Sequence, residues 1–334
     1  MSNTQPIPES PLFVLIVGAG LGGLMLGTIL ENANIPCGYD CLLVSRPKLH
    51  DLLRQRVPDH KISVGKKVLR QDEHDGKVTA YCSDDTMYEC SVLVGADGAY
   101  SAVRQNIYKQ LDDEGKLPLS YKAPFTIGYT TIVGTASHLN PERYPELNDK
   151  CSHFRIIFGN KNDSSYAVTV PDNKICWALQ IQTSESKSED ENLDWGQESL
   201  DTMIKEFEES PCAYGGTMKD IFDATLKKLI SKTFLEEKVF RTWYHGRSVL
   251  IGDACHKILP GAGQGAGLAF RDAVVLANCL YNMKDNSFKS IKSAFDNYYK
   301  QRYPEAEMQL KKSAYSSKIM FGQVYNVNSL NEME

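Results

Sequence analysis

Residues 249–273 constrain the fold of this chain more than any other stretch. An apolar strand pattern ends there at Gly252-Asp253, and a glycine-rich loop leads into an Ala-rich helical pattern that begins at Gly265. Glycines let a backbone approach a bound group and adopt positive φ, while a helix start offers unpaired N–H groups and partial positive charge. The stretch therefore predicts a loop that binds an electron-rich ligand.

A second glycine cluster lies far upstream, with Gly18, Gly20 and Gly23 in a Gly-x-Gly-x-x-Gly arrangement. Residues 13–17 before it are typical of a buried strand, and residues 24–33 after it of a helix. This is the context that a dinucleotide-binding fingerprint requires. An ordinary glycine-rich turn is the alternative.

The bulk composition narrows the possible partners. The chain has 334 residues, of which 42% are hydrophobic and 24% charged, so two domains are the better expectation. A net charge of −5 without a long Lys/Arg run argues against nucleic acid or an anionic membrane as the main partner. Residues 1–11 predict a flexible tail without signal-peptide character, and no apolar run approaches the roughly 20 residues that span a bilayer. We expect a soluble, cytoplasmic protein that binds small molecules; its oligomeric state is not defined by the sequence.

The nine cysteines are scattered without a Cys-x-x-Cys pair, and their odd number fits reduced thiols in the cytosol. We therefore expect neither a disulfide nor a metal site. Cys255-His256 is the only adjacent pair of soft ligands, and packing is the favoured interpretation there. A hydrolase triad is not indicated either, because no Gly-x-Ser-x-Gly motif occurs and the histidines are dispersed.

The first domain segment is predicted to span residues 12–115. After the glycine cluster, a helix is expected at residues 47–56. Alternation of polar and apolar residues predicts strands at residues 62–71, 77–83 and 87–94.

A second domain, at residues 116–238, is predicted to contain an antiparallel sheet with one open face, because its segments alternate between polar and apolar residues. Its strands are expected at residues 125–132, 153–158, 166–170 and 175–182. Residues 184–192 are charged and Ser-rich, which is typical of a solvated loop. Apolar residues at helical spacing follow in residues 200–207 and 221–230.

The chain is predicted to return to the first domain at residues 239–287. Residues 288–334 form a C-terminal helical segment, and its helix at residues 288–320 is expected to be interrupted by Pro304. The predicted fold class is α/β (α+β), with a Rossmann-like nucleotide-binding domain assembled from two distant segments and an inserted antiparallel-sheet substrate domain.

Three charged side chains stand where a ligand could bind. Asp253 ends a strand in a glycine-rich turn and could accept hydrogen bonds from sugar-like hydroxyls, with a cap for the turn as the alternative. Asp97 occupies a similar position, where a turn-forming role is equally reasonable. Arg46 could pair with a phosphate. The helix that starts near Gly265 could stabilise negative charge on a bound ring, which a reduced, anionic flavin would carry.

Taken in order, these motifs resemble those of the FAD-dependent aromatic-hydroxylase-like monooxygenases, particularly fungal members that oxidise natural-product skeletons. The matching motifs are Gly18-x-Gly20-x-x-Gly23, Ser45-Arg46-Pro47-x-Leu49-His50, Gly95-Ala96-Asp97-Gly98 with Ser101 and Arg104, and Gly252-Asp253-Ala254 through Gly263-Gln264-Gly265. The resemblance covers most of residues 12–320, although the middle sheet matches by pattern more than by motif.

The resemblance implies FAD as cofactor and NAD(P)H as co-substrate. It places Gly18, Gly20 and Gly23 at the FAD pyrophosphate. It also places Arg46 against FAD, Asp97 in the FAD/NAD(P)H region and Asp253 on the ribityl chain. Gly265 and Ala266 would lie beside the flavin ring, and the loop residues Pro260 and Gly263 would also bind the cofactor.

In the family reaction, O2 supplies one oxygen atom to the substrate and the other leaves as water. No catalytic side chain is assigned, because the cofactor supplies the chemistry. The expected substrate is a hydrophobic, ring-containing or isoprenoid small molecule.

The sequence departs from the family pattern between Pro36 and Tyr39. There the resemblance predicts a second strand, and an acidic residue that holds the adenosine ribose, which this chain lacks. Asp40 stands near the expected spacing, but its neighbours fit the approach to the Arg46 motif better. A shortened, catalytically impaired flavoprotein-like protein is therefore the alternative hypothesis. A flavin-dependent reductase that does not activate oxygen is a third.

Overall fold

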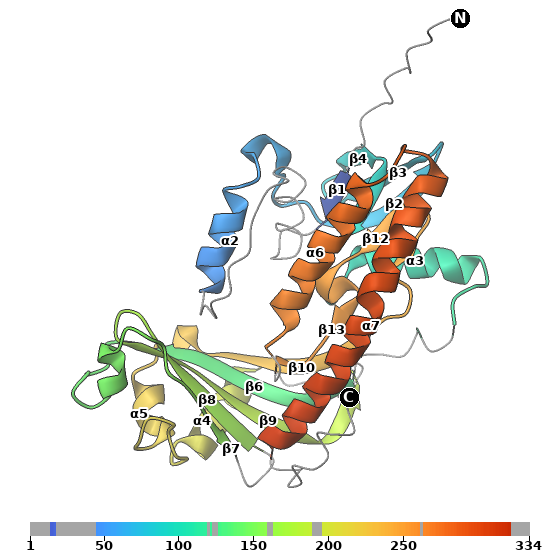
Figure 1. Ribbon diagram of the computed structural model, residues 1–334. Helices are drawn as coiled ribbons and strands as arrows, with labels where there is room; N and C mark the ends of the chain where they lie inside the picture. Colours follow the sequence, from blue (N-terminus) through green and yellow to red (C-terminus); the bar gives the residue numbers. More distant parts are fainter. Residues whose placement is uncertain are drawn as a thin grey trace, which may run out of the picture. The chain divides into compact units, whose positions relative to one another are not determined.

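The computed structural model describes residues 14–17, 45–118, 121, 126–158, 163–188, 196–260 and 263–321. Among these residues, those within Met1–Ala123 and Lys238–Leu310 form one compact unit, and those within Pro124–Glu237 and Lys311–Glu334 form a second (Figure 1). The FAD-binding and substrate roles assigned to the two parts of the chain remain predictions.

The first unit contains a mostly parallel sheet in the order β1-β5-β12-β11. Its strands are β1 (Val14–Val17), β5 (Val92–Gly95), β12 (Ser248–Leu250) and β11 (Tyr244–His245). β1 and β12 both pair with β5 in parallel, and β11 pairs with β12 in antiparallel fashion. The sheet thus joins strands from the beginning and the end of the chain, as the two-segment prediction requires.

A smaller antiparallel sheet accompanies it, formed by β2 (Val68–His74), β3 (Lys77–Cys82) and β4 (Met87–Cys90). The helices of the first unit are α2 (Arg46–Arg54), α3 (Ala102–Asp113), α6 (Gly265–Tyr281) and the first part of α7 (Phe288–Met320). α3 packs against β2, β5 and β12. α6 and the first part of α7 lie side by side, joined by the ion pair of Asp272 with Arg302 (Figure 1).

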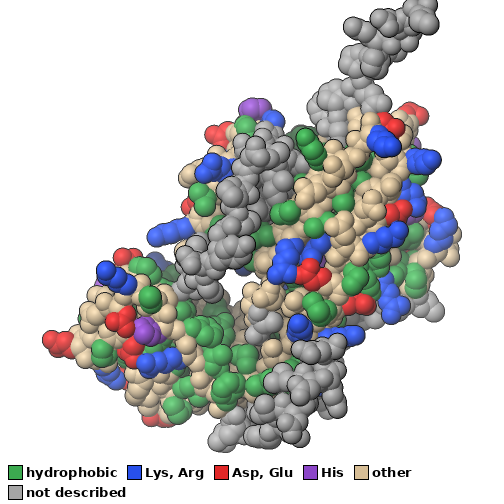
Figure 2. Space-filling view, viewed as in Figure 1, with side chains coloured by type: hydrophobic (Ala, Val, Ile, Leu, Met, Phe, Trp, Pro, Cys, Tyr) green, Lys and Arg blue, Asp and Glu red, His purple; other side chains and the backbone are tan. Residues whose placement is uncertain are grey.

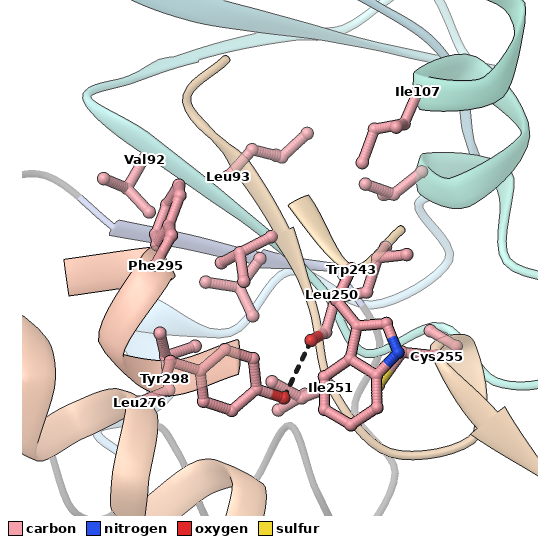
Figure 3. Close-up of a cluster of buried hydrophobic side chains, with 14 of the residues drawn as sticks. Val92, Leu93, Ile107, Trp243, Leu250, Ile251, Cys255, Leu276, Phe295 and Tyr298 are labelled. Atoms are coloured by element: carbon pink, nitrogen blue, oxygen red, sulfur yellow. Dashed lines mark hydrogen bonds between the residues drawn. The ribbon is translucent and has the colours of Figure 1, made fainter. Parts of the chain in front are cut away.

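The core of the first unit forms where these layers meet. Val92, Leu93 and Val94 of β5 are all fully buried, which is typical of a central parallel strand covered on both faces. Aromatic residues from α7 and the segment before β11 pack beside them (Figure 3). The Tyr298 hydroxyl donates a hydrogen bond to the Leu250 carbonyl at 3.0 Å, so its burial leaves no unpaired donor (Figure 3).

The second unit is built on an antiparallel sheet with the order β10-β6-β9-β8-β7. Its strands are β6 (Thr126–Ala136), β7 (Phe154–Phe158), β8 (Asp163–Val170), β9 (Lys174–Ser188) and β10 (Ser231–Val239). Helices α4 (Gln197–Phe207) and α5 (Met218–Asp223) share a core with one face of it, around Ile132, Trp177 and Leu179. Lys238 and Val239, the last two residues of β10, belong to the first unit and pair there with β13 (His256–Lys257).

The strand predicted at residues 87–94 is wrong as a single element. It forms β4 and β5, which belong to different sheets and meet at Ser91. The burial patterns explain the division, because β4 alternates while β5 is buried at every position. The strand predicted at residues 62–71 begins only at Val68, after Gly65 adopts a φ of +72° that interrupts extended backbone.

Three other predictions need correction. β9 continues to Ser188, so part of the expected loop at residues 184–192 is strand. The helix expected at residues 221–230 ends at Asp223, because Thr225 forms a bridge with Ala136.

α7 runs through Pro304 without interruption. Proline inside a helix costs about 3 kcal/mol. Burial of Tyr298, Arg302 and Ala306 on the surrounding turns offsets that cost.

Lys/Arg and Asp/Glu side chains are interspersed on the face drawn in Figure 2, outside its grey atoms, without a large field of one sign. In the part of the chain that the structure describes, no helix has the length and apolar character needed to cross a bilayer.

Candidate functional site

Three parallel strands of the first unit end at one edge of its sheet. Val17 of β1 pairs with Gly95 of β5, and Gly95 pairs with Leu250 of β12. The segments that follow these strands therefore leave the sheet at the same edge, which is where open α/β sheets bind ligands. Two of them carry the predicted carboxylates Asp97 and Asp253.

The glycine cluster follows β1 at this edge, but Gly18, Gly20 and Gly23 lie outside the described residues. The same holds for the predicted gap between Pro36 and Tyr39. Their expected role thus remains a prediction.

Asp253 lies in a 3-10 turn, Gly252–Ala254, directly after β12. Asp253 is exposed, yet desolvation by the surrounding protein raises the pKa of its carboxyl above the ordinary 3.8. The nearby charges of His256, Lys257 and Arg46 oppose the rise. The structure thus brings two predicted site residues, Arg46 and Asp253, within electrostatic reach of each other.

Arg46 is the first residue of α2 and is exposed. Pro47 follows it at the helix start, where the fixed φ of proline suits the helix. The N–H that proline lacks would have no hydrogen-bond partner within the helix at this position. The sequence motif therefore sets the place of the arginine by starting a helix there.

Asp97 follows β5 and caps α3. Its Oδ2 accepts hydrogen bonds from the backbone N–H groups of Ala102 at 2.7 Å and Val103 at 3.3 Å. Its Oδ1 is buried and has no hydrogen-bond partner among the described residues. One oxygen therefore performs the structural task, and the other is left for a ligand.

We expect Asp97→Ala to lower the free energy of unfolding by about 1 kcal/mol, because two N–H groups of α3 lose their acceptor. Chemical denaturation followed by circular dichroism measures this. Asp97→Asn, which keeps an acceptor oxygen, should be less destabilised; equal losses in both variants would contradict the capping role.

Arg104, the last residue of the Asp97 motif, has a structural role. It is buried, its Nη1 donates to the Ala254 carbonyl at 2.9 Å, and its guanidinium stacks 4.0 Å from the centre of the Phe240 ring. It also donates to the Ala99 carbonyl. Arg104 therefore joins the segment after β5 to the turn that carries Asp253.

The loop before α6 offers open backbone. Gly263 has a φ of +63°. Apart from chain neighbours and the helix's own backbone, no heavy atom of the described residues lies within 4 Å of the position that a Cβ would take there or at Gly265. Pro260 and Ala266 are exposed. Gln264, at the N-cap of α6, makes no side-chain capping bond, so the first N–H groups of this 17-residue helix keep their capacity to bind a ligand.

Sequence reasoning missed a buried network beneath this loop. Asp272 of α6 is 0% exposed, and its Oδ2 accepts from the Gly252 N–H at 2.9 Å and lies 2.6 Å from His256 Nε2. Its Oδ1 accepts from Arg302 Nε at 2.8 Å. The positive partners hold the pKa of Asp272 below its usual value despite the burial. The available signal was an Arg271-Asp272 pair within an Ala- and Leu-rich helix.

Cys255, His256 and Asp272 are also close enough to suggest a metal site. Both Asp272 oxygens already accept hydrogen bonds, however, and the Arg302 guanidinium beside them would repel a cation. The cluster therefore fits a structural network better than a metal site, in agreement with the packing interpretation.

Comparisons with known proteins agree with this geometry. A family model described as an FAD binding domain matches residues 214–313. The FAD-dependent monooxygenase esdpE of Penicillium shearii is 30% identical over 251 residues, which cover 74% of this chain and 50% of the relative. The FAD-dependent monooxygenase ptmM of Penicillium ochrochloron is 27% identical over 316 residues, covering 91% of this chain and 72% of the relative.

Solved structures show the same fold. A variant of HpxO from Klebsiella pneumoniae in complex with FAD superposes with a TM-score of 0.73 at 17% identity, covering 97% of this chain and 94% of that one. A salicylate hydroxylase substrate complex gives a TM-score of 0.70 at 18% identity, covering 97% and 92%.

The chain therefore shares its fold with HpxO and with salicylate hydroxylase. The chain is thus similar in sequence to FAD-dependent monooxygenases, and the relatives named above are fungal. It spans about half of the length of esdpE and about three quarters of that of ptmM.

The described residues fit FAD, the cofactor that the family match supports. The buried Asp97 Oδ1 has no partner among them, Gly263 and Gly265 leave open space, and the start of α6 is uncapped. The Asp97 oxygen could accept a hydrogen bond from a hydroxyl, the open space at the glycines could hold a flat ring, and the helix start could stabilise negative charge.

Proposed function

We propose that this protein is an FAD-dependent monooxygenase that uses NAD(P)H and O2 to hydroxylate or epoxidise a hydrophobic small molecule. One observation carries the proposal: Asp97, Asp253 and the uncapped start of α6 accompany parallel strands that end at one sheet edge. The names of the sequence relatives support the same activity.

In this proposal Asp253 accepts hydrogen bonds from the ribityl hydroxyls of FAD, and Gly263, Gly265 and Ala266 lie beside its ring. The N–H groups at the start of α6 stabilise negative charge on that ring. Asp97 offers its free Oδ1 to the cofactor region. Gly18, Gly20 and Gly23 take the pyrophosphate together with Arg46, whose planar guanidinium suits phosphate oxygens.

When bound, FAD would carry electrons from NAD(P)H to O2, so that one oxygen atom enters the substrate and the other leaves as water. The chain's own residues need only bind, orient and exclude water, and no side chain is assigned as nucleophile or base.

We place the substrate against one face of the sheet in the second unit. α4 and α5 share a core with the face that carries Ile132 and Trp177. Directly paired residues share a face, so the opposite face carries Tyr129 with its partners Gln182 and Leu235. This second face becomes apolar toward β7. There the exposed Phe154 packs against Tyr166, with their ring centres 5.6 Å apart. A mixed surface of this kind suits a largely hydrophobic molecule with a few oxygen atoms.

Glu237 is the strongest candidate for a polar substrate contact. It lies two residues after Leu235 on β10, hence on the second face. Burial raises the pKa of Tyr129, and the nearby charge of Glu237 adds to that rise. Its Oε2 is buried without a partner among the described residues, and burial raises the pKa of its own carboxyl. Its carboxylate oxygens can accept hydrogen bonds from a substrate hydroxyl.

We expect Glu237→Leu to raise the free energy of unfolding by about 1 kcal/mol, because an unpaired buried polar atom is replaced by an apolar side chain. Urea unfolding compares it with the wild type. Lys238→Leu, a neighbouring change on the same strand, should give no such gain. A loss of stability in Glu237→Leu would show that the carboxyl has a structural role instead.

The purified protein's visible spectrum tests the function. After incubation with excess FAD and desalting, we expect a yellow protein, and a colourless one would sink the proposal for this chain. That outcome would favour the impaired flavoprotein, which the break between Pro36 and Tyr39 suggests. Transfer of oxygen from isotopically labelled O2 into a product then separates a monooxygenase from a flavin reductase.

A further inference from the structure

We propose that Asp272 is a positioning residue that sets the conformation of the cofactor loop by holding the Gly252 N–H. The proposal rests on the FAD-binding role of that loop. Asp272 comes from α6, whose first turn is one part of the candidate site, and it bonds to Gly252, which directly precedes Asp253 in the other part. One carboxylate therefore fixes two separate parts of the site relative to each other.

The Gly252 backbone is in a conformation that needs such support. Its φ is +62°, and a Cβ there would lie 3.2 Å from the Ala269 Cβ on α6. Its carbonyl accepts from the Cys255 N–H at 2.9 Å, which closes the turn. Its N–H is directed inward and would be a buried orphan without Asp272.

Asp272 is itself held from two further directions. His256 lies on β13 after the turn, and Arg302 lies on α7; they are 1% and 2% exposed. Arg302 is in turn paired with Glu305. Because both oxygens of the carboxylate accept hydrogen bonds, the position of the carboxylate is fixed. The Gly252 N–H can keep its hydrogen bond only while the turn holds its present conformation.

This arrangement predicts the effect of Asp272→Asn, which removes the negative charge of the side chain and keeps its shape. In Asp272→Asn the amide nitrogen replaces one of the two oxygens. Either Arg302 loses its acceptor, Oδ1, or the contacts that Gly252 and His256 both make with Oδ2 are lost. We expect the Kd for FAD to rise about ten- to a hundredfold, the range found when an outer partner that orients metal ligands is removed.

The experiment compares wild type, Asp272→Asn and Glu73→Gln. Glu73 is a matched control, because it accepts from the Arg247 N–H at 2.9 Å and pairs with the Arg247 guanidinium at 3.7 Å, yet contacts neither part of the loop. Flavin fluorescence titration gives the Kd for FAD. Visible circular dichroism of the bound FAD reports the environment and orientation of its ring. The expected result is weaker binding and an altered visible spectrum in Asp272→Asn only.

Equal Kd and spectra in wild type and Asp272→Asn would overturn the proposal, as would the same change in Glu73→Gln. Should Asp272→Asn not fold, Arg302→Lys, which keeps the positive charge but loses the planar geometry, should shift Kd in the same direction by a smaller factor. Hydrogen exchange of residues 248–257 in the FAD-free protein gives a readout that does not depend on FAD. Faster exchange there in the variant, when wild type binds no FAD, would retain the positioning role and reject the proposed function.

Discussion

Replacing Asp253 with alanine is expected to raise the Kd for FAD about ten- to a hundredfold. Hydrogen bonds to a charged acceptor contribute roughly 1.5–3 kcal/mol, which corresponds to that range. The turn itself should survive, because the exposed Asp253 side chain makes no hydrogen bond within the described residues, while Arg104 and Asp272 hold the backbone around it. Flavin fluorescence titration of the purified variant measures the change.

The same carboxyl predicts a pH dependence with a definite sign. Desolvation raises the Asp253 pKa above 3.8, so the carboxylate becomes protonated at a higher pH than a free aspartate would. Protonation removes its negative charge and turns one oxygen into a donor, so FAD affinity should fall as the pH decreases through this pKa. Asp253→Asn should bind more weakly at neutral pH and lack this acidic loss.

An exposed aspartate elsewhere in the first unit provides the control for the alanine variant. Asp59→Ala removes a carboxylate that pairs with Arg54 at the surface, and FAD affinity should not change. If Asp253→Ala binds FAD as tightly as wild type, the ribityl contact assigned to this residue is wrong.

The predictable parts of the site are those encoded locally. The β12 strand, the turn at Gly252 and the start of α6 at Gly265 each follow from neighbouring residues, because strand, turn and helix preferences act over short distances. Pro47 likewise marks the start of α2 beside Arg46.

What the sequence did not reveal depends on contacts between distant segments. Asp272 is 20 residues from Gly252 and 30 from Arg302, and Arg104 is 150 residues from Ala254. No pattern within a short stretch of sequence predicts contacts between residues so far apart. The division of residues 87–94 at Ser91 is similar, because only pairing with β1 and β12 distinguishes β5 from β4. Leu226, at helical spacing in the sequence, is 56% exposed because the chain leaves the helix before it.

Two tryptophans that are buried in the described part of the chain, one in each unit, allow the units to be tested separately. Trp243 is 0% exposed in the first unit (Figure 3). Its indole N–H donates to the Phe240 carbonyl at 2.6 Å, and its ring lies 5.4 Å from that of His256. Trp177 is 2% exposed in the second, where it donates to Thr225 at 3.0 Å. Replacing either with alanine should cost about 3–5 kcal/mol, because truncation of a buried tryptophan leaves a large cavity.

The two variants should differ in FAD binding. Trp243→Ala removes the support behind His256 and thus behind Asp272 and Gly252, so it should weaken FAD binding as well as speed hydrogen exchange in the first unit. Trp177→Ala should speed exchange in the second unit with little change in Kd, because its contacts are with Phe222 and Thr225. Exchange resolved by peptide is the suitable measurement, since a protein of two units need not unfold in one step. An equal loss of FAD affinity in both variants would mean that the cofactor depends on the second unit as much as on the first.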